Sequence, residues 1–281
     1  MHVFVAAEGF FLPGCEGGQR FCLLTGPVAA ESRGAVLYVH PFAEELNKSR
    51  RMATLAATSL AGEGWTVLQP DLLGCGDSSG DFVEASWDAW LADLDAACLW
   101  LGEQGFERIV LWGLRAGALL VSDWLSRAGA NDHSVLLWQP VGNGKQHLNQ
   151  FLRLKGVSGM LDEHDAKAVM AAMRADIDAG KAVEVAGYML GPALCSGLEA
   201  AKLGFRPSFR APVRLLEISS VEPAVCSPAV SMLVERMIVQ GVDVVARCVH
   251  GPSFWQAQEI EVCEALLDAT VVALDEMHGS H

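Results

Sequence analysis

Two glycines bracket an arginine where an apolar run passes directly into an amphipathic segment. Gly113 and Gly117 each stand two residues from Arg115, and the run 109–112 precedes them. The pattern predicts a strand that turns at once into a helix, and small residues are needed where the two backbones meet. A guanidinium stays protonated up to about pH 12 and offers only donors. The segment therefore places a permanent positive charge at the tip of a tight turn.

Four more polar segments follow or separate predicted strands. They are 38–43, which contains His40, Pro41 and Phe42; 71–78, which runs from Asp71 to Ser78; Glu222-Pro223; and His250-Gly251-Pro252. An imidazole can exchange protons near neutral pH, and a carboxylate can orient it. These segments are the candidates for chemistry beside Arg115.

Taken in chain order, these segments resemble the α/β-hydrolase superfamily over the whole chain. Segment 113–117 is similar to the Gly-x-Ser-x-Gly nucleophile elbow, with Arg115 at the serine position. Segment 38–43 is similar to the oxyanion loop, and 71–78 to the Asp-x-x-Gly-x-Gly-x-Ser loop before the elbow. The resemblance implies an α/β fold with a mostly parallel, doubly wound sheet and a helical cap insertion.

The resemblance also implies roles for individual residues. By this resemblance His250 is the catalytic base and Glu222 is the triad acid. Arg115 occupies the elbow position but is not a nucleophile. Substrate-binding positions carried over from the oxyanion loop and the elbow are His40, Pro41, Phe42, Leu114 and Ala116. No cofactor and no metal are expected.

One subfamily is similar in more detail. The elbow Gly-Leu-Arg-x-Gly-Ala-Leu-Leu, at 113–120, resembles that of the exosortase A system-associated hydrolases of the type called hydrolase 2. This resemblance implies a bacterial setting of exopolysaccharide export and sorting of PEP-CTERM proteins by the exosortase.

Arg115 changes what such a site can do. A guanidinium has no free lone pair, so the ordinary acyl-enzyme route of the Ser-His-acid triad is closed. Backbone N–H groups of the oxyanion loop and the N-terminus of the following helix also favour negative charge there. Three alternatives remain open: a bound carboxylate, phosphate or sulfate; an internal salt bridge with Glu222; or catalysis by another nucleophile, such as water activated by His250, Cys75 or Ser78.

Several of these residues also have purely structural interpretations. His40 could simply pack at a strand end, and Ser78 and Asp71 could stabilise their own loop by local hydrogen bonds. The Gly74-x-Gly76 pair lacks the third glycine and the immediate helix of a dinucleotide fingerprint.

The elements that must position these residues alternate between strand and helix, which is typical of a parallel sheet covered on both faces. Strands are predicted at 35–39, 65–69, 108–112, 134–138, 213–219 and 242–249, and helices at 44–60, 87–101, 116–127, 165–177, 229–240 and 257–274. Ser86 is the predicted N-cap of the helix that begins at residue 87. Between the fourth and fifth strands, residues 141–206 are rich in alanine and methionine, and we predict them to be a helical cap without strands.

Composition limits the class of protein. The 281 residues are 51% hydrophobic, enough for one large core, so one domain over 1–281 is predicted. Twenty Lys and Arg stand against 34 Asp and Glu, giving a formal charge of -14, which argues against nucleic acid and anionic lipid as partners.

The eight cysteines show neither Cys-x-x-Cys nor zinc-finger spacing, so we expect reduced thiols. With no secretory signal and no transmembrane segment recognised, a cytoplasmic location is expected.

Three functions fit these observations. The first is a hydrolase-like protein acting on an acyl or ester compound in an exosortase or exopolysaccharide locus. The second is a non-catalytic module of the same fold that holds an anionic or acyl ligand between Arg115 and the cap. The third is an accessory scaffold with a closed pocket. A methionine-rich cap suits a flexible apolar ligand such as an acyl chain.

Overall fold

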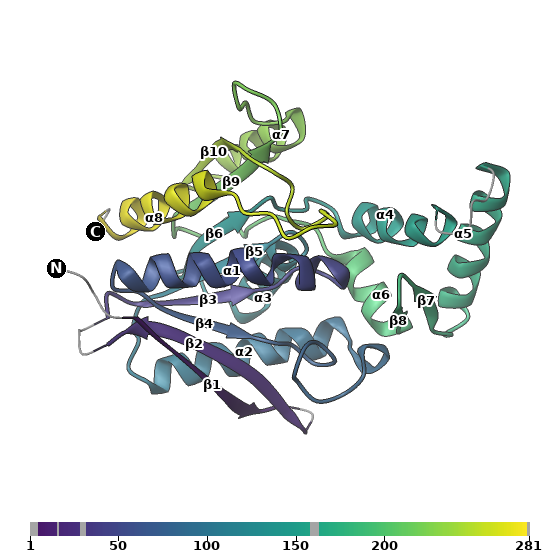
Figure 1. Ribbon diagram of the computed structural model, residues 1–281, viewed down its shortest axis with the longest axis horizontal. Helices are drawn as coiled ribbons and strands as arrows, with labels where there is room; N and C mark the ends of the chain where they lie inside the picture. Colours follow the sequence, from purple (N-terminus) through teal and green to yellow (C-terminus); the bar gives the residue numbers. More distant parts are fainter. Residues whose placement is uncertain (1–4, 16, 29–31, 158–162, 280–281) are drawn as a thin grey trace.

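The computed structural model describes residues 5–15, 17–28, 32–157 and 163–279, and its centre is an eight-stranded sheet (Figure 1). The strand order is β1-β2-β4-β3-β5-β6-β9-β10. Their bounds are β1 Val5–Pro13, β2 Gln19–Pro27, β3 Ala35–Val39, β4 Thr66–Pro70, β5 Ile109–Leu114, β6 Ser134–Trp138, β9 Val213–Ser219 and β10 Val244–His250. From β4 to β10 all neighbours are parallel, while β1, β2 and β4 pair antiparallel. The predicted mostly parallel, doubly wound α/β fold is confirmed.

Helices cover both faces of this sheet. On one face lie α1 (Glu44–Gly62) and α8 (Glu264–Gly279), which share an apolar cluster with Trp112 and Trp138. On the other lie α2 (Trp87–Glu103), α3 (Gly117–Ala128) and α7 (Pro228–Val239), in a larger cluster. Because both faces are covered, every residue of β3 and β5 is buried, which explains their unbroken apolar sequences.

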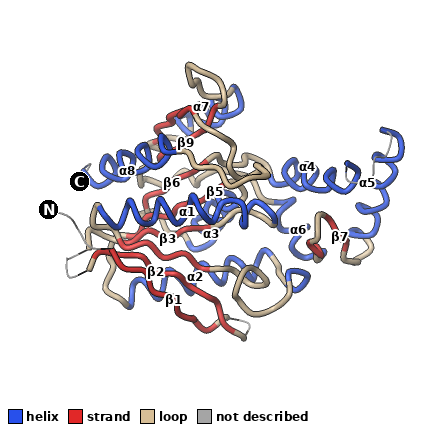
Figure 2. The backbone as a smooth tube through the Cα atoms, in the orientation of Figure 1, coloured by secondary structure: helices blue, strands red, loops and turns tan. Residues whose placement is uncertain are grey.

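The cap lies between β6 and β9 and extends to one side of the sheet, mostly as helix (Figures 1 and 2). It contains α4 (Gly144–Val157), α5 (Glu163–Asp178), α6 (Pro192–Ala200) and a hairpin of β7 (Val183–Val185) and β8 (Tyr188–Leu190). The sequence analysis predicted no strand here. The turn of the hairpin explains the difference, because Ala186 and Gly187 both have positive φ, at 50° and 83°, as a two-residue hairpin turn requires.

Two further features differ from the sequence-based prediction: one hairpin and the start of the last helix. The hairpin of β1 and β2 was not predicted, and the last helix begins at Glu264 instead of near 257. The preceding segment is held instead against α1, where the Lys48 ammonium donates to the Gln256 carbonyl at 3.4 Å and the Cys263 N–H to the Met52 sulfur at 3.3 Å. Ser86 caps α2 as predicted, accepting from Ala89 N–H at 3.0 Å. None of the described helices combines the length and apolar character needed to cross a bilayer.

Candidate active site at the elbow

The turn after β5 has the tight geometry that its glycines predicted. Arg115 stands at its tip with φ 54°, a backbone conformation that side-chain-bearing residues rarely adopt. A Cβ on Gly113 would lie 2.7 Å from the Cα of Ala118, and one on Gly117 would overlap the carbonyl oxygen of Val39. The glycines are thus required because β5, β3 and α3 meet here without space for side chains.

Arg115 forms a salt bridge with Glu45 in the first turn of α1. Its Nε and Nη2 both lie 3.1 Å from Glu45 Oε1, and both side chains are less than one-fifth exposed. The guanidinium also stacks on Trp255, with Cζ 5.3 Å from the ring centroid. An internal salt bridge was one of the predicted alternatives, but its acid is Glu45 and not Glu222. The reason is the position of α1, which follows the oxyanion-loop segment directly and brings its first turn over the elbow.

A second buried group, His147 of α4, faces the same salt bridge. Its Nε2 lies 3.9 Å from Glu45 Oε2, and among the described residues neither imidazole nitrogen nor Glu45 Oε2 has a hydrogen-bond partner. Burial, with a smaller contribution from the Arg115 charge, lowers the pKa of His147 to about 3. Burial raises the pKa of Glu45, and Arg115 opposes that rise. The imidazole is therefore neutral at physiological pH and offers one donor and one acceptor.

These groups line a cavity of about 220 Å³, which we call the Arg115 cavity. Its walls come from α1, the elbow, α4 and the loop after β10: Glu44, Glu45, Lys48, Arg115, His147, Gln150, Phe151, Leu154, Trp255 and Gln256. Of these, sequence reasoning singled out only Arg115. Glu45, His147 and Trp255 were missed, because nothing in their spacing relates them to the elbow.

The residues predicted to bind substrate do not line this cavity. Phe42 is buried and packs its ring on His147 and Phe151, so it lies beneath the cavity wall. Leu114 and Ala116 are also buried. His40 accepts from Leu72 N–H at Nε2 (3.3 Å), so its Nδ1–H donates to the Pro41 carbonyl at 2.9 Å. His40 thus joins two loops, which is the structural interpretation of that residue.

Glu222 and His250 meet at the ends of β9 and β10. His250 Nδ1 and Glu222 Oε1 are 3.4 Å apart, and their side chains are 49% and 74% exposed. Neither lines the Arg115 cavity, and within the described chain no hydrogen bond or ion pair joins His250 to Arg115. The structure therefore brings the predicted acid and base together, but it places Trp255 against the guanidinium.

The two side chains suggested as alternative nucleophiles have other roles. The Ser78 hydroxyl donates to the Asp71 carbonyl at 2.5 Å and accepts from Phe21 N–H. The Asp71 carboxylate binds Arg50 and Asp77 N–H, so both residues stabilise their loop. Cys75 is buried, and burial raises the pKa of its thiol far above the ordinary value. A thiol kept protonated is a poor nucleophile.

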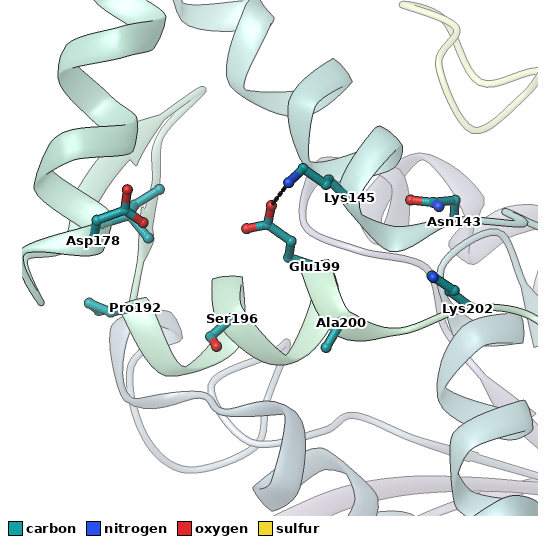
Figure 3. A pocket seen from close by; sticks show the side chains of 9 residues that line it. Asn143, Lys145, Asp178, Pro192, Ser196, Glu199, Ala200 and Lys202 are labelled. Carbon is teal, nitrogen blue, oxygen red and sulfur yellow. Dashed lines mark ion pairs between the residues drawn. The ribbon is translucent and has the colours of Figure 1, made fainter.

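A larger cavity of about 800 Å³ lies within the cap (Figure 3). Glu199 on its wall pairs with Lys145 at 3.0 Å and with Arg174 at 2.9 Å. It shares no lining residue with the Arg115 cavity. Volume alone does not mark the site here, because the strained turn and the unpartnered polar atoms lie at the smaller cavity.

Solved structures with the same architecture include esterases and serine hydrolases. The esterase Est1E from Butyrivibrio proteoclasticus, solved with ferulic acid, is 14% identical, with 96% of this chain and all of that chain covered and a TM-score of 0.67. A Xanthomonas campestris α/β serine hydrolase without a lid is 14% identical, covering 96% and 94% at TM-score 0.58. An esterase from Rhizomucor miehei is 16% identical, covering 99% and 86% at 0.60. No family model and no curated protein sequence matches the chain.

The topology, the tight turn after β5 and these neighbours define the class of protein. The chain has the α/β-hydrolase fold. At the position where that fold carries its nucleophile it holds Arg115, paired with Glu45.

Proposed function

We propose that this chain is a hydrolase-like protein of the exosortase A-associated type that binds a small, uncharged acyl or ester compound in the Arg115 cavity without forming an acyl-enzyme. The observation that carries the proposal is Arg115 at the strained tip of the elbow, ion-paired to Glu45 on the wall of a cavity. The resemblance of 113–120 to the hydrolase 2 elbow supports the exosortase and exopolysaccharide setting.

The charges around the cavity favour an uncharged ligand over an anion. Arg115 is neutralised by Glu45, and Lys48 pairs with Glu44 at 3.1 Å. An incoming carboxylate would have to compete with Glu45 for the guanidinium and would bring a further negative charge close to that carboxylate.

The unpartnered polar atoms favour a ligand that both donates and accepts. Glu45 Oε2 can only accept, whereas neutral His147 has one nitrogen of each kind. Buried polar atoms without partners cost about 1–3 kcal/mol each, so a ligand that satisfies them gains affinity. A hydroxyl or an ester carbonyl next to a hydroxyl fits this requirement. Ferulic acid, bound by the Butyrivibrio protein, carries a phenolic hydroxyl, and its methyl ester is an uncharged compound with the same hydroxyl.

Binding of methyl ferulate and of ferulate tests the proposal. We expect the uncharged ester to raise the melting temperature in a concentration-dependent way and the carboxylate to raise it less. His147→Leu should remove most of the effect, whereas His250→Ala, outside the cavity, is the matched control. Equal stabilisation of wild type and His147→Leu, or a stronger response to ferulate, would contradict the proposal.

A second candidate is hydrolysis of the ester by water, favoured by the 3.4 Å contact of His250 and Glu222. In this route the imidazole removes a proton from water and the carboxylate orients the imidazole, with no covalent intermediate. The turnover of a panel of p-nitrophenyl esters and acyl-CoA thioesters tests this route. Turnover that His250→Ala abolishes and Arg115→Lys retains would establish it, and no turnover above the His250→Ala background would exclude it for these esters.

A further inference from the structure

Three potential metal ligands that are far apart in the sequence meet beside the strands β9 and β10. Glu217 of β9 and Cys248 of β10 are direct partners in the parallel register, so their side chains point to the same face of the sheet. Cys226 stands just before α7, which packs on β10 on that face. One ligand atom from each residue lies within 4.8 Å of the other two. Figure 1 shows α7, β9 and β10 gathered at one end of the sheet.

We propose that Glu217, Cys226 and Cys248 bind a zinc ion, with water as the fourth ligand. Zinc takes thiolate, imidazole and carboxylate ligands in tetrahedral sites, and two thiolates with one carboxylate suit a borderline-soft divalent cation better than Mg²⁺ or Ca²⁺. Zinc–sulfur bonds of about 2.3 Å put tetrahedral sulfurs about 3.8 Å apart, within the observed spread. The ligand atoms therefore already lie close to the spacing that a tetrahedral zinc site requires.

The surroundings of the three side chains support this assignment. Glu217 is 5% exposed, and its Oε2 accepts from Ser227 N–H at 2.7 Å, which fixes the orientation of the carboxylate. The Sγ atoms of the two cysteines lie within 4.8 Å of each other. Binding of Zn²⁺ would release the two thiol protons and give the buried carboxylate a cation.

The position of the ligands indicates what the ion would do. Cys226 is four residues after Glu222, Glu217 is five residues before it, and Cys248 is two residues before His250. The ion would tie both ends of the loop that carries Glu222 to the strand that ends at His250. Its role would be to position this pair, which is otherwise exposed.

Zinc titration of the reduced, metal-free protein against a chromophoric chelator tests the site. We expect one Zn²⁺ per chain, and we expect Cys226→Ser, Cys248→Ser and Glu217→Gln each to weaken binding by at least about tenfold. Cys15→Ser, at an exposed cysteine elsewhere, is the control and should bind like wild type. Cobalt should give a thiolate charge-transfer band that both cysteine variants diminish. Substoichiometric binding, or affinity unchanged in all three variants, would overturn the proposal.

A second measurement on the wild type does not depend on the folding of variants. Alkylation with iodoacetamide followed by peptide mapping should show that Zn²⁺ protects Cys226 and Cys248 but leaves Cys15 reactive. If the two cysteines are instead joined by a disulfide in air-oxidised protein, and Zn²⁺ gives no protection after dithiothreitol has reduced that disulfide, the pair is a redox pair and the metal site is excluded.

Discussion

Arg115 Nη2 lies 3.1 Å from Glu45 Oε1, and this salt bridge joins the tip of the turn after β5 to the first turn of α1. The acid is thus supplied by the helix that follows segment 38–43, while Glu222, which the sequence analysis predicted as the acid, pairs with His250 elsewhere on the same edge of the sheet. One consequence is that the positive charge of Arg115 is neutralised by Glu45 of the same chain. The other is that stability at this turn depends on both partners.

Removing both partners of the salt bridge should cost less than the sum of the two single losses. Arg115→Met leaves a largely buried carboxylate unpaired, and Glu45→Gln leaves the guanidinium without its counter-ion. We expect each variant to lower the free energy of unfolding by about 2–4 kcal/mol, and the double variant to fall short of their sum by about 1–3 kcal/mol. Urea unfolding of the four proteins measures the coupling. Strictly additive losses would mean that the salt bridge contributes nothing.

Substitution of the elbow glycines should be far more damaging than substitution of a helix glycine. A methyl group at Gly117 overlaps the Val39 carbonyl, so we expect Gly117→Ala to cost about 3 kcal/mol or more. Gly102 of α2 has no atom within 4 Å of an added Cβ, so Gly102→Ala should stabilise by about 0.5–1 kcal/mol. Thermal unfolding compares them. A wild-type melting temperature for Gly117→Ala would refute the close contact of β3 with α3.

Acid should destabilise the protein partly through His147. Its pKa is about 3 in the folded state and about 6.5 in the unfolded chain, so the unfolded state binds more protons between these values. The contribution is complete above pH 6.5 and is lost as the pH falls toward 3, a loss of up to about 5 kcal/mol. Unfolding of wild type and His147→Leu from pH 7 to pH 4 should therefore give a shallower decline for the variant. Parallel curves would show that His147 is not buried in its neutral form.

The exposed pair of Glu222 and His250 should contribute little to stability. Both side chains are about half exposed or more, and solvent screens such pairs, so Glu222→Gln and His250→Ala should each change the free energy of unfolding by less than about 1 kcal/mol. Any loss of ester turnover in these variants then reports on chemistry. With zinc bound, the same variants should stay folded and bind the ion as wild type does. A loss of several kcal/mol in either would place the pair in a structural role.

Structural features that depend on neighbouring residues in the chain were predictable from the sequence. The strand 35–39, the strand 134–138 and the Ser86 cap agree with the structure, because periodicity and capping depend on neighbours in the chain. The tight turn at Arg115 followed from its two glycines, and the meeting of Glu222 with His250 from the resemblance to a known order of loops. The hairpin of β7 and β8 was missed because its strands are only three residues long.

The sequence by itself determined the α/β class, the strand-to-helix turn and the presence of a cation at its tip. Only the tertiary structure decided what that cation faces, since Glu45, His147 and Trp255 reach it from a helix, the cap and a late loop. The same holds for Glu217, Cys226 and Cys248, which parallel register and the start of α7 bring together. Chain neighbours are set by covalent bonds, but partners across a sheet depend on strand order and packing, which no local spacing encodes.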